Sequence, residues 1–136
     1  QVLMAENNEL ELEPDSLDAI MLVLSFHDLY YAAPEDGWPA IDVPAFLAEL
    51  HSGLRTGGLV GIIDHYAADG APSETGSTTH RIDPAIVIAA MTEAGFVHDG
   101  QSDILRNPDD DYEKTVFDPE LRGKTDRFVM RFRKPE

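Results

Sequence analysis

The sequence predicts an α/β fold organised around two parallel, buried strands, and three features of the chain support this expectation. Residues 18–25 and 59–63 each contain apolar side chains without alternation, and the first of these segments is typical of a strand covered on both faces. Residues 43–54 lie between the two runs and place apolar side chains at helical spacing. A strand, a helix and a strand in this order form a βαβ unit with parallel strands and a right-handed crossover.

The first half of the chain opens with a short apolar run, residues 2–5, which predicts a brief strand followed by a loop. Residues 18–25 are then expected to be a central strand. After a loop rich in proline and glycine, Asp42 is placed to cap the first helix, and Gly57 and Gly58 are expected to end it before the strand at 59–63.

The second half continues the alternation of helix and strand. A loop of small residues at 67–79 leads to Asp83 and Pro84, a capping residue and a proline at the first helical position. Gly95 is expected to end this second helix, and a strand begins at Phe96. Residues 107–124 form a long acidic loop, and residues 127–132 close the chain as a strand with alternating apolar side chains.

Composition limits the classes of function that are open to the chain. Its 136 residues, 43% of them hydrophobic, suffice for one core, and therefore for one domain or less. The formal net charge of −16 repels phosphate groups, so no nucleic-acid or membrane partner is expected. Without cysteine, there is no disulfide framework and no thiolate metal site. No signal peptide is visible in these residues, and the compartment is left open, with the cytoplasm favoured.

Six segments of the chain resemble one family of proteins. They read DAIMLVLSFHDLYY at 18–31, LRTGGLVGIIDH at 54–65, HRID at 80–83, EAGF at 93–96, LRNP at 105–108 and KTDRFVMRFRKP at 124–135. Together with the order of the elements, they are similar to the C-terminal half of class I, S-adenosylmethionine-dependent methyltransferases, in particular a family of predicted bacterial enzymes. The similarity covers nearly the whole chain.

The resemblance implies a Rossmann-like methyltransferase fold of the three-layer sandwich type for residues 1–136. In the family's order, these residues would supply a remnant of strand 3, strands 4 to 7 with a terminal hairpin, and two main helices. This portion of a single methyltransferase domain lacks the glycine-rich half that holds most of the cofactor. The implied cofactor is S-adenosyl-L-methionine, and its binding to these residues alone is expected to be weak or absent.

The resemblance also implies cofactor-binding residues. Glu6 matches the family position whose carboxylate accepts a hydrogen bond from the adenine amino group, and the backbone of Asn7 is the second partner. The alternative for Glu6 is a solvated carboxylate of an acidic chain. Ser25 and Phe26 belong to the segment that closes over the cofactor in the family.

His27 and Asp28 follow at the carboxyl end of the first long strand, where open α/β sheets bind their ligands. They are candidates for orienting or deprotonating the methyl acceptor. The alternative is that Asp28 caps a turn and His27 is a half-buried histidine with satisfied hydrogen bonds. His65, at the end of the neighbouring strand, is the third catalytic candidate, because methyl transfer from a sulfonium needs alignment and, for a weak nucleophile, a base.

Further residues near these strand ends are candidates for binding the acceptor: Tyr30, Asp64, Tyr66, His80 and Arg81. His80 and Arg81 follow a loop of glycine, serine and threonine and are expected to act as a lid or to bind an acidic acceptor. The histidines near the strand ends are not spaced on one helix, so no metal site is expected. The arginines of the acidic loop region are expected to form surface ion pairs.

Two functions are considered. The first is S-adenosylmethionine-dependent methyl transfer to a small-molecule acceptor. The second is a truncated, non-catalytic binding or oligomerisation module of the same fold. An uncovered strand as apolar as residues 19–24 favours association, so we expect a homodimer or pairing with a missing N-terminal segment.

Overall fold

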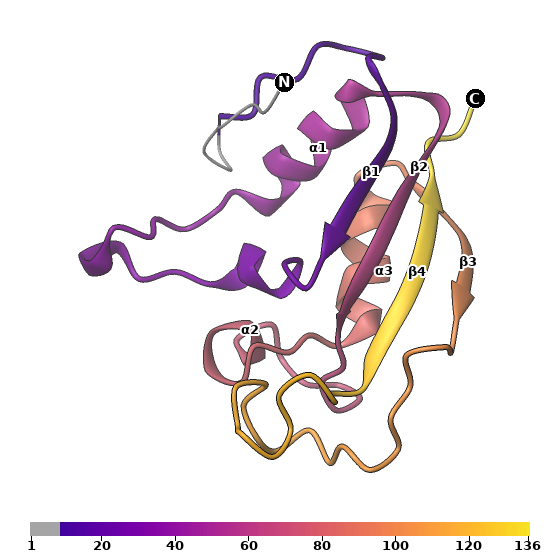
Figure 1. The fold of residues 1–136 in the computed structure, drawn as a ribbon. Helices are drawn as coiled ribbons and strands as arrows, with labels where there is room; N and C mark the ends of the chain where they lie inside the picture. Colours follow the sequence, from indigo (N-terminus) through magenta and orange to yellow (C-terminus); the bar gives the residue numbers. More distant parts are fainter. Residues whose placement is uncertain (1–8) are drawn as a thin grey trace.

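The computed structural model describes residues 9–136, so the predicted strand at 2–5 and the cofactor candidates Glu6 and Asn7 lie outside the described residues. The elements in chain order are β1 (Leu17–Val23), the 3₁₀ turns η1 (His27–Tyr30) and η2 (Pro34–Asp36), α1 (Val43–Gly53), β2 (Leu54–His65), α2 (Thr75–Thr78), α3 (Pro84–Glu93), β3 (Val97–Ser102) and β4 (Arg127–Arg133) (Figure 1).

One four-stranded sheet contains all the described strands, in the order β1-β2-β4-β3. β1 and β2 are parallel and are joined through α1, as the βαβ pattern predicts. β4 lies between β2 and β3 and is antiparallel to both, so the last two strands form the expected terminal hairpin. The predicted mixed α/β architecture is therefore confirmed.

Both main helices begin at the predicted caps. Asp42 Oδ1 accepts a hydrogen bond of 3.0 Å from the backbone N–H of Ala45, and Asp83 Oδ1 accepts one of 2.8 Å from that of Ala85. Asp83 Oδ2 also accepts a hydrogen bond from the Gly70 N–H at 2.7 Å, which ties the preceding loop to the start of α3. No helix in the described part of the chain is both long and apolar enough to cross a membrane.

The end of α1 differs from the prediction that Gly57 and Gly58 stop the helix. α1 ends at Gly53, and Leu54 is already extended, with its side chain fully buried in the core. The C-terminal segment supports this early extension, because Lys134 donates its backbone N–H to the Gly58 carbonyl and its Nζ to the Leu54 carbonyl, at 3.0 and 2.7 Å. Gly57 instead provides a left-handed turn within β2, with φ of 77°.

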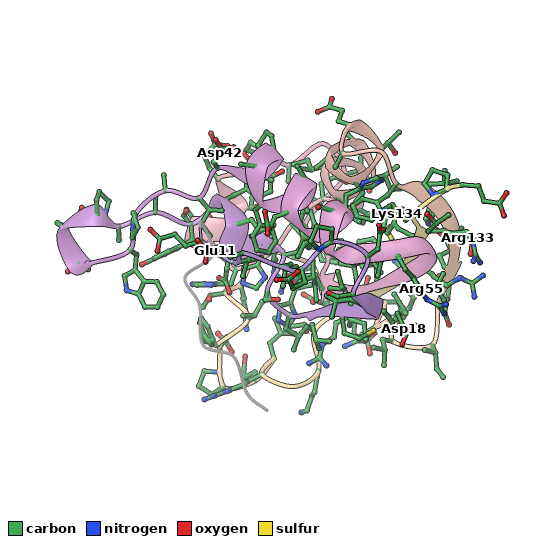
Figure 2. The ribbon with its side chains drawn as sticks, turned by 90° about the horizontal axis from the view of Figure 1, so that it is seen from above. Glu11, Asp18, Asp42, Arg55, Arg133 and Lys134 are labelled. Carbon is green, nitrogen blue, oxygen red and sulfur yellow. The ribbon has the colours of Figure 1, made fainter. Side chains whose placement is uncertain are left out.

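The described residues form two of the three layers of the predicted sandwich. α1 and α3 contact each other and lie on the same side of the sheet (Figures 1 and 2). The sheet residues that face them are buried: Val60, Ile62, Phe128, Met130 and Phe132. On the other face, no helix of residues 9–136 covers Met21 and Val23, which are 60% and 50% exposed. β1 is therefore an edge strand with one open face, and not the doubly covered central strand that its apolar run predicts.

Basic side chains near the end of β4 are paired with acidic ones. Arg131 and Arg133 both contact Asp99 Oδ2, at 3.0 and 2.7 Å. Arg55 pairs with Asp18 at 2.8 Å, and these two residues lie at the same end of the molecule as Arg133 (Figure 2). Asp99 thus offsets one of the two arginine charges, and Asp18 offsets the charge of Arg55.

Candidate active site at the strand ends

Polar side chains gather at the carboxyl ends of β1 and β2, as predicted. η1 follows β1 directly, and Asp64 and His65 end β2. The two strands are parallel and in register, with Val23 opposite Ile63, so the segments that follow them emerge at the same edge of the sheet. This edge is the usual place for a ligand in an open α/β sheet.

Asp64 is the buried centre of this arrangement. Its side chain is fully buried and accepts three hydrogen bonds of 2.8 Å, from the His27 backbone N–H, the His27 Nδ1–H and the His65 backbone N–H. Asp64 thereby fixes η1 against the end of β2 and sets the orientation of the His27 ring. It was predicted to bind the acceptor, but in the structure its oxygens accept hydrogen bonds from His27 and His65.

His27 lies between two carboxylates. Its side chain is 5% exposed, with Nδ1 on Asp64 and Nε2 at 3.2 Å from Asp28 Oδ1. Burial alone lowers the pKa of His27, but the hydrogen bonds and charges of Asp28 and Asp64 outweigh burial and raise the pKa to about 9. His27 is thus a buried histidine with satisfied hydrogen bonds, which was one of the two alternatives for it. It also contacts the exposed Asp28.

His65 has the opposite electrostatic environment. Its Nδ1 lies 2.6 Å from the hydroxyl of buried Thr125, and its ring centroid lies 5.9 Å from that of His27. Burial, with further contributions from the neighbouring cations, lowers the pKa of His65 to about 4, although Asp64 opposes this shift. At neutral pH the His65 ring is uncharged. Thr125, on the segment before β4, was missed by the sequence analysis because it lies 60 residues away in the chain.

His80 reaches the same place from the segment after α2. Its Nδ1 is 3.8 Å from Asp28 Oδ1, and its ring packs edge-on against His27 at 5.4 Å. On its other sides, the rings of Tyr31 and Phe117 lie at 6.1 and 4.8 Å. The structure therefore places His80 beside His27 and Asp28.

A cavity of about 1090 Å³ opens beside these groups. Its lining includes Ser25, Phe26, Asp28, Tyr31, Trp38 and His80. Asp28 and His80 present a carboxylate and an imidazole, and the aromatic rings provide apolar walls. This combination suits a small molecule that is held by its apolar surface and oriented by few polar groups.

Several predicted site residues lie behind or beside the cavity. His27 and His65 are 4% and 6% exposed and are not among the residues that line it. Tyr30 is half buried against the core, and its carbonyl accepts a hydrogen bond from the Ser77 hydroxyl at 3.1 Å. Tyr66 packs edge-on against Phe128, with ring centroids 5.4 Å apart, and does not line the cavity.

Arg81 is not part of a lid or of an acceptor-binding surface. Its side chain is completely buried and forms a bidentate ion pair with Asp110, with both hydrogen bonds at 2.9 Å. Two further hydrogen bonds, at 2.9 and 3.0 Å, go to the backbone carbonyls of Tyr66 and Lys114. Arg81 therefore fastens the acidic loop to the end of β2.

The ion pairs of the acidic loop region are also less exposed than predicted. Asp126 is fully buried and accepts hydrogen bonds from Arg106 Nε at 2.9 Å, from the Tyr112 hydroxyl at 2.7 Å and from the Asn107 backbone N–H at 2.7 Å. The Arg106 guanidinium lies over the Tyr66 ring at 4.1 Å from its centroid. Tyr66 thus belongs to this structural cluster, which holds the loop in place around the site.

Comparisons with known proteins identify the fold. No family model matches the chain, and no curated protein matches it in sequence. A methyltransferase dependent on S-adenosylmethionine from Aquifex aeolicus has a similar structure, with a TM-score of 0.61 and 19% identity, over 98% of this chain and 54% of that one. The putative methyltransferase in complex with the Trm112 methyltransferase activator of Haloferax volcanii gives a TM-score of 0.63 and 19% identity, over 98% and 60% of the two chains.

The chain thus spans a little more than half the length of these two structures. The [4+2]-cyclase SpnF is similar as well, with a TM-score of 0.56 and 12% identity, over 96% of this chain and 55% of that one. Because one fold supports different reactions, the similarity identifies architecture and leaves the reaction to the site. The fold of this chain is the Rossmann-like fold of class I, S-adenosylmethionine-dependent methyltransferases.

Proposed function

We propose that the chain takes part in methyl transfer from S-adenosyl-L-methionine to a small-molecule acceptor. The observation that carries this proposal is the convergence of Asp28 and His80 on one wall of a cavity at the carboxyl ends of β1 and β2. Such an edge of the sheet is where this type of fold binds its ligands. The similarity to methyltransferase structures supports the cofactor, since the fold is shared with them.

In this proposal, Ser25 and Phe26 contact the cofactor, and Asp28 and His80 contact the acceptor. The nucleophilic atom of the acceptor attacks the sulfonium methyl group in line with the breaking C–S bond, which leaves the neutral thioether S-adenosylhomocysteine. An acceptor hydroxyl donates a hydrogen bond to Asp28, which orients it, and its proton passes to the His80 imidazole. His27 and Asp64 act as positioning residues behind Asp28, and His65 supports His27 as an uncharged neighbour.

The aromatic lining supports a small, partly apolar acceptor. Tyr31 and Trp38 lie 6.4 Å apart with their rings nearly perpendicular, and Trp38 is 62% exposed. These rings provide contact area and exclude water from one side of the cavity. The Asp28 carboxylate and the His80 imidazole orient the bound acceptor. A polymer with a phosphate backbone is disfavoured by the net charge of −16.

The test is a methyl-transfer assay that measures S-adenosylhomocysteine by mass spectrometry. The chain is incubated with S-adenosylmethionine and a panel of small aromatic and aliphatic hydroxyl, thiol and amine compounds. Turnover that falls by roughly 100-fold or more in Asp28→Asn, with a circular dichroism spectrum like that of the unsubstituted chain, supports the proposal. Turnover that is unchanged in Asp28→Asn, or absent with every acceptor, contradicts it.

We also propose that the chain associates through its open sheet face, with a second copy or with an N-terminal segment of the same fold. Met21 and Val23 are exposed on this face, and the apolar groove beside them is also lined by Ala19, Leu59 and Val129. Burying an apolar strand edge and face removes a surface that otherwise promotes aggregation. The methyltransferase that is bound to the activator of Haloferax volcanii is a precedent for pairing in this fold.

A further inference from the structure

We infer that His27, Asp28 and His80 form a binding site for a divalent transition-metal ion. The donor atoms of these three side chains all lie within 4.8 Å of one another. Asp28 Oδ1 lies 3.2 Å from His27 Nε2 and 3.8 Å from His80 Nδ1. Three atoms at this spacing can bind one ion at the usual metal–ligand distances of about 2.0–2.2 Å.

The orientation of His27 is typical of a metal ligand. Its Nδ1 lies 2.8 Å from Asp64 Oδ1, and Asp64 is fully buried and fixed by two backbone N–H groups. A hydrogen bond from Nδ1–H to a buried carboxylate fixes the ring and directs Nε2 towards an ion, which replaces the Nε2 proton on binding. Nε2 is directed towards Asp28.

The backbone conformation and the ring contacts of His80 also hold it in place. It has a left-handed backbone, with φ of 57°, which is uncommon for a residue other than glycine. Its ring is packed between Tyr31, stacked at 25°, and Phe117, which meets it nearly edge-on. A strained backbone that several contacts maintain is a recurrent property of functional positions.

Charge and access also favour a cation at this position. The carboxylates of Asp28 and Asp64 both contact His27, Asp28 also faces His80, and the His65 ring packs near that of His27. Asp28 and His80 line the large cavity, so a bound ion would keep a coordination position open towards it. Three protein ligands with an open position are the arrangement of catalytic metal sites.

The donor set selects the class of metal. Two imidazoles and one carboxylate suit Zn²⁺, Fe²⁺, Co²⁺ or Ni²⁺, whereas Mg²⁺ and Ca²⁺ prefer oxygen ligands. On the proposed function, an acceptor oxygen would occupy the open position and lose its proton more readily there. The metal site itself rests on the geometry of the three ligands and does not require methyl transfer.

The test is calorimetric titration of the EDTA-treated and desalted chain with ZnCl₂, in a buffer with excess Mg²⁺ that saturates the exposed carboxylates. We expect one saturable site, and visible absorption bands when Co²⁺ is used instead. His80→Asn keeps a residue that tolerates the left-handed backbone, and it should weaken Zn²⁺ binding by about tenfold or more. His51→Asn, on α1 and outside the cluster, is the matched control and should bind as the unsubstituted chain does.

Asp64→Asn provides a second test, because it leaves all three ligands in place and replaces the carboxylate behind His27 Nδ1 by a neutral amide. Its Zn²⁺ affinity should fall by about 10–100-fold, while thermal unfolding shows how much chain remains folded. The inference is overturned if the unsubstituted chain binds no Zn²⁺, or if His80→Asn and His51→Asn bind it equally. Zn²⁺ binding without methyl transfer would overturn the proposed function alone, and methyl transfer without Zn²⁺ binding would overturn this inference alone.

Discussion

Arg81 and Asp110 form a bidentate ion pair in which neither side chain is exposed to solvent. The pair joins Arg81, three positions before the start of α3, to the acidic loop, 29 positions further along the chain. Asp110 Oδ2 also accepts a hydrogen bond from the Asp126 backbone N–H at 2.7 Å, so the pair connects the loop to the start of β4. The loop that carries Phe117 onto His80 is held by this interaction.

We predict that Arg81→Met lowers the free energy of unfolding by about 3–5 kcal/mol, because it leaves Asp110 buried without its partner. Urea denaturation of Arg81→Met and of the unsubstituted chain measures the difference. Arg81→Met/Asp110→Asn should recover part of the loss. Arg122→Ala, at an exposed arginine of the same loop, is the control and should change stability by less than about 0.5 kcal/mol. Equal losses in Arg81→Met and Arg122→Ala would show that the buried pair is not what holds the loop.

Gly76→Ala should disturb the candidate site directly. A Cβ at position 76 would overlap the carbonyl oxygen of His27, so η1 and α2 must move away from each other. We expect a loss of about 1–3 kcal/mol in stability and altered chemical shifts of the His27 and His80 rings. Thr78→Ala on the same short helix is the control, since its hydroxyl forms one exposed hydrogen bond at 3.4 Å. Unchanged histidine resonances in Gly76→Ala would mean that the close contact does not control the site.

Asp126 should make the stability of the chain sensitive to acid. Burial raises its pKa, but hydrogen bonds from Arg106, Tyr112 and the Asn107 N–H outweigh burial and hold the pKa below its ordinary value of 3.8. A carboxyl group with a lowered folded pKa stabilises the fold above its unfolded pKa, and this contribution disappears as pH falls through the folded value. The melting temperature of Asp126→Asn should therefore lie below that of the unsubstituted chain at pH 7, and the difference should narrow below pH 3.8. A difference that is constant with pH would contradict this assignment.

The open sheet face predicts concentration-dependent association. Light scattering after gel filtration should detect a dimer of the chain, and Met21→Glu should shift it to the monomer, because a charge in an apolar interface is costly to bury. Ile104→Glu is the control, as this side chain is 82% exposed on the segment after β3. A monodisperse monomer at high concentration would contradict self-association through this face.

Much of the architecture follows from local patterns in the sequence. Asp42 and Asp83 begin helices because their side chains accept the first free N–H groups, and this needs information from only a few neighbouring residues. The alternation of Phe128, Met130 and Phe132 likewise predicts which face of β4 is buried. The convergence of His27, Asp28 and Asp64 follows from the parallel order of β1 and β2.

The remaining features depend on contacts between distant segments. Lys134 bonds to Leu54 from 80 positions away and so extends β2 back to that residue. Gly57 and Gly58 alone therefore do not predict where α1 ends. Arg81 is hydrophilic and follows a loop, and only its pairing with Asp110 explains why it is buried. An apolar run such as that of β1 predicts two covered faces, but the described residues supply helices for one of them.

The most direct test of the proposed site is titration of the ¹⁵N-labelled chain with S-adenosylhomocysteine, followed by NMR and by the fluorescence of Trp38, the single tryptophan of the chain. We expect weak but saturable binding, with a dissociation constant of roughly 1 mM, or about −4 kcal/mol. The perturbed resonances should be those of the cavity wall, including Ser25, Phe26, Asp28 and Trp38. No saturable response, or shifts confined to residues away from the ends of β1 and β2, would contradict a cofactor and acceptor site at this edge of the sheet.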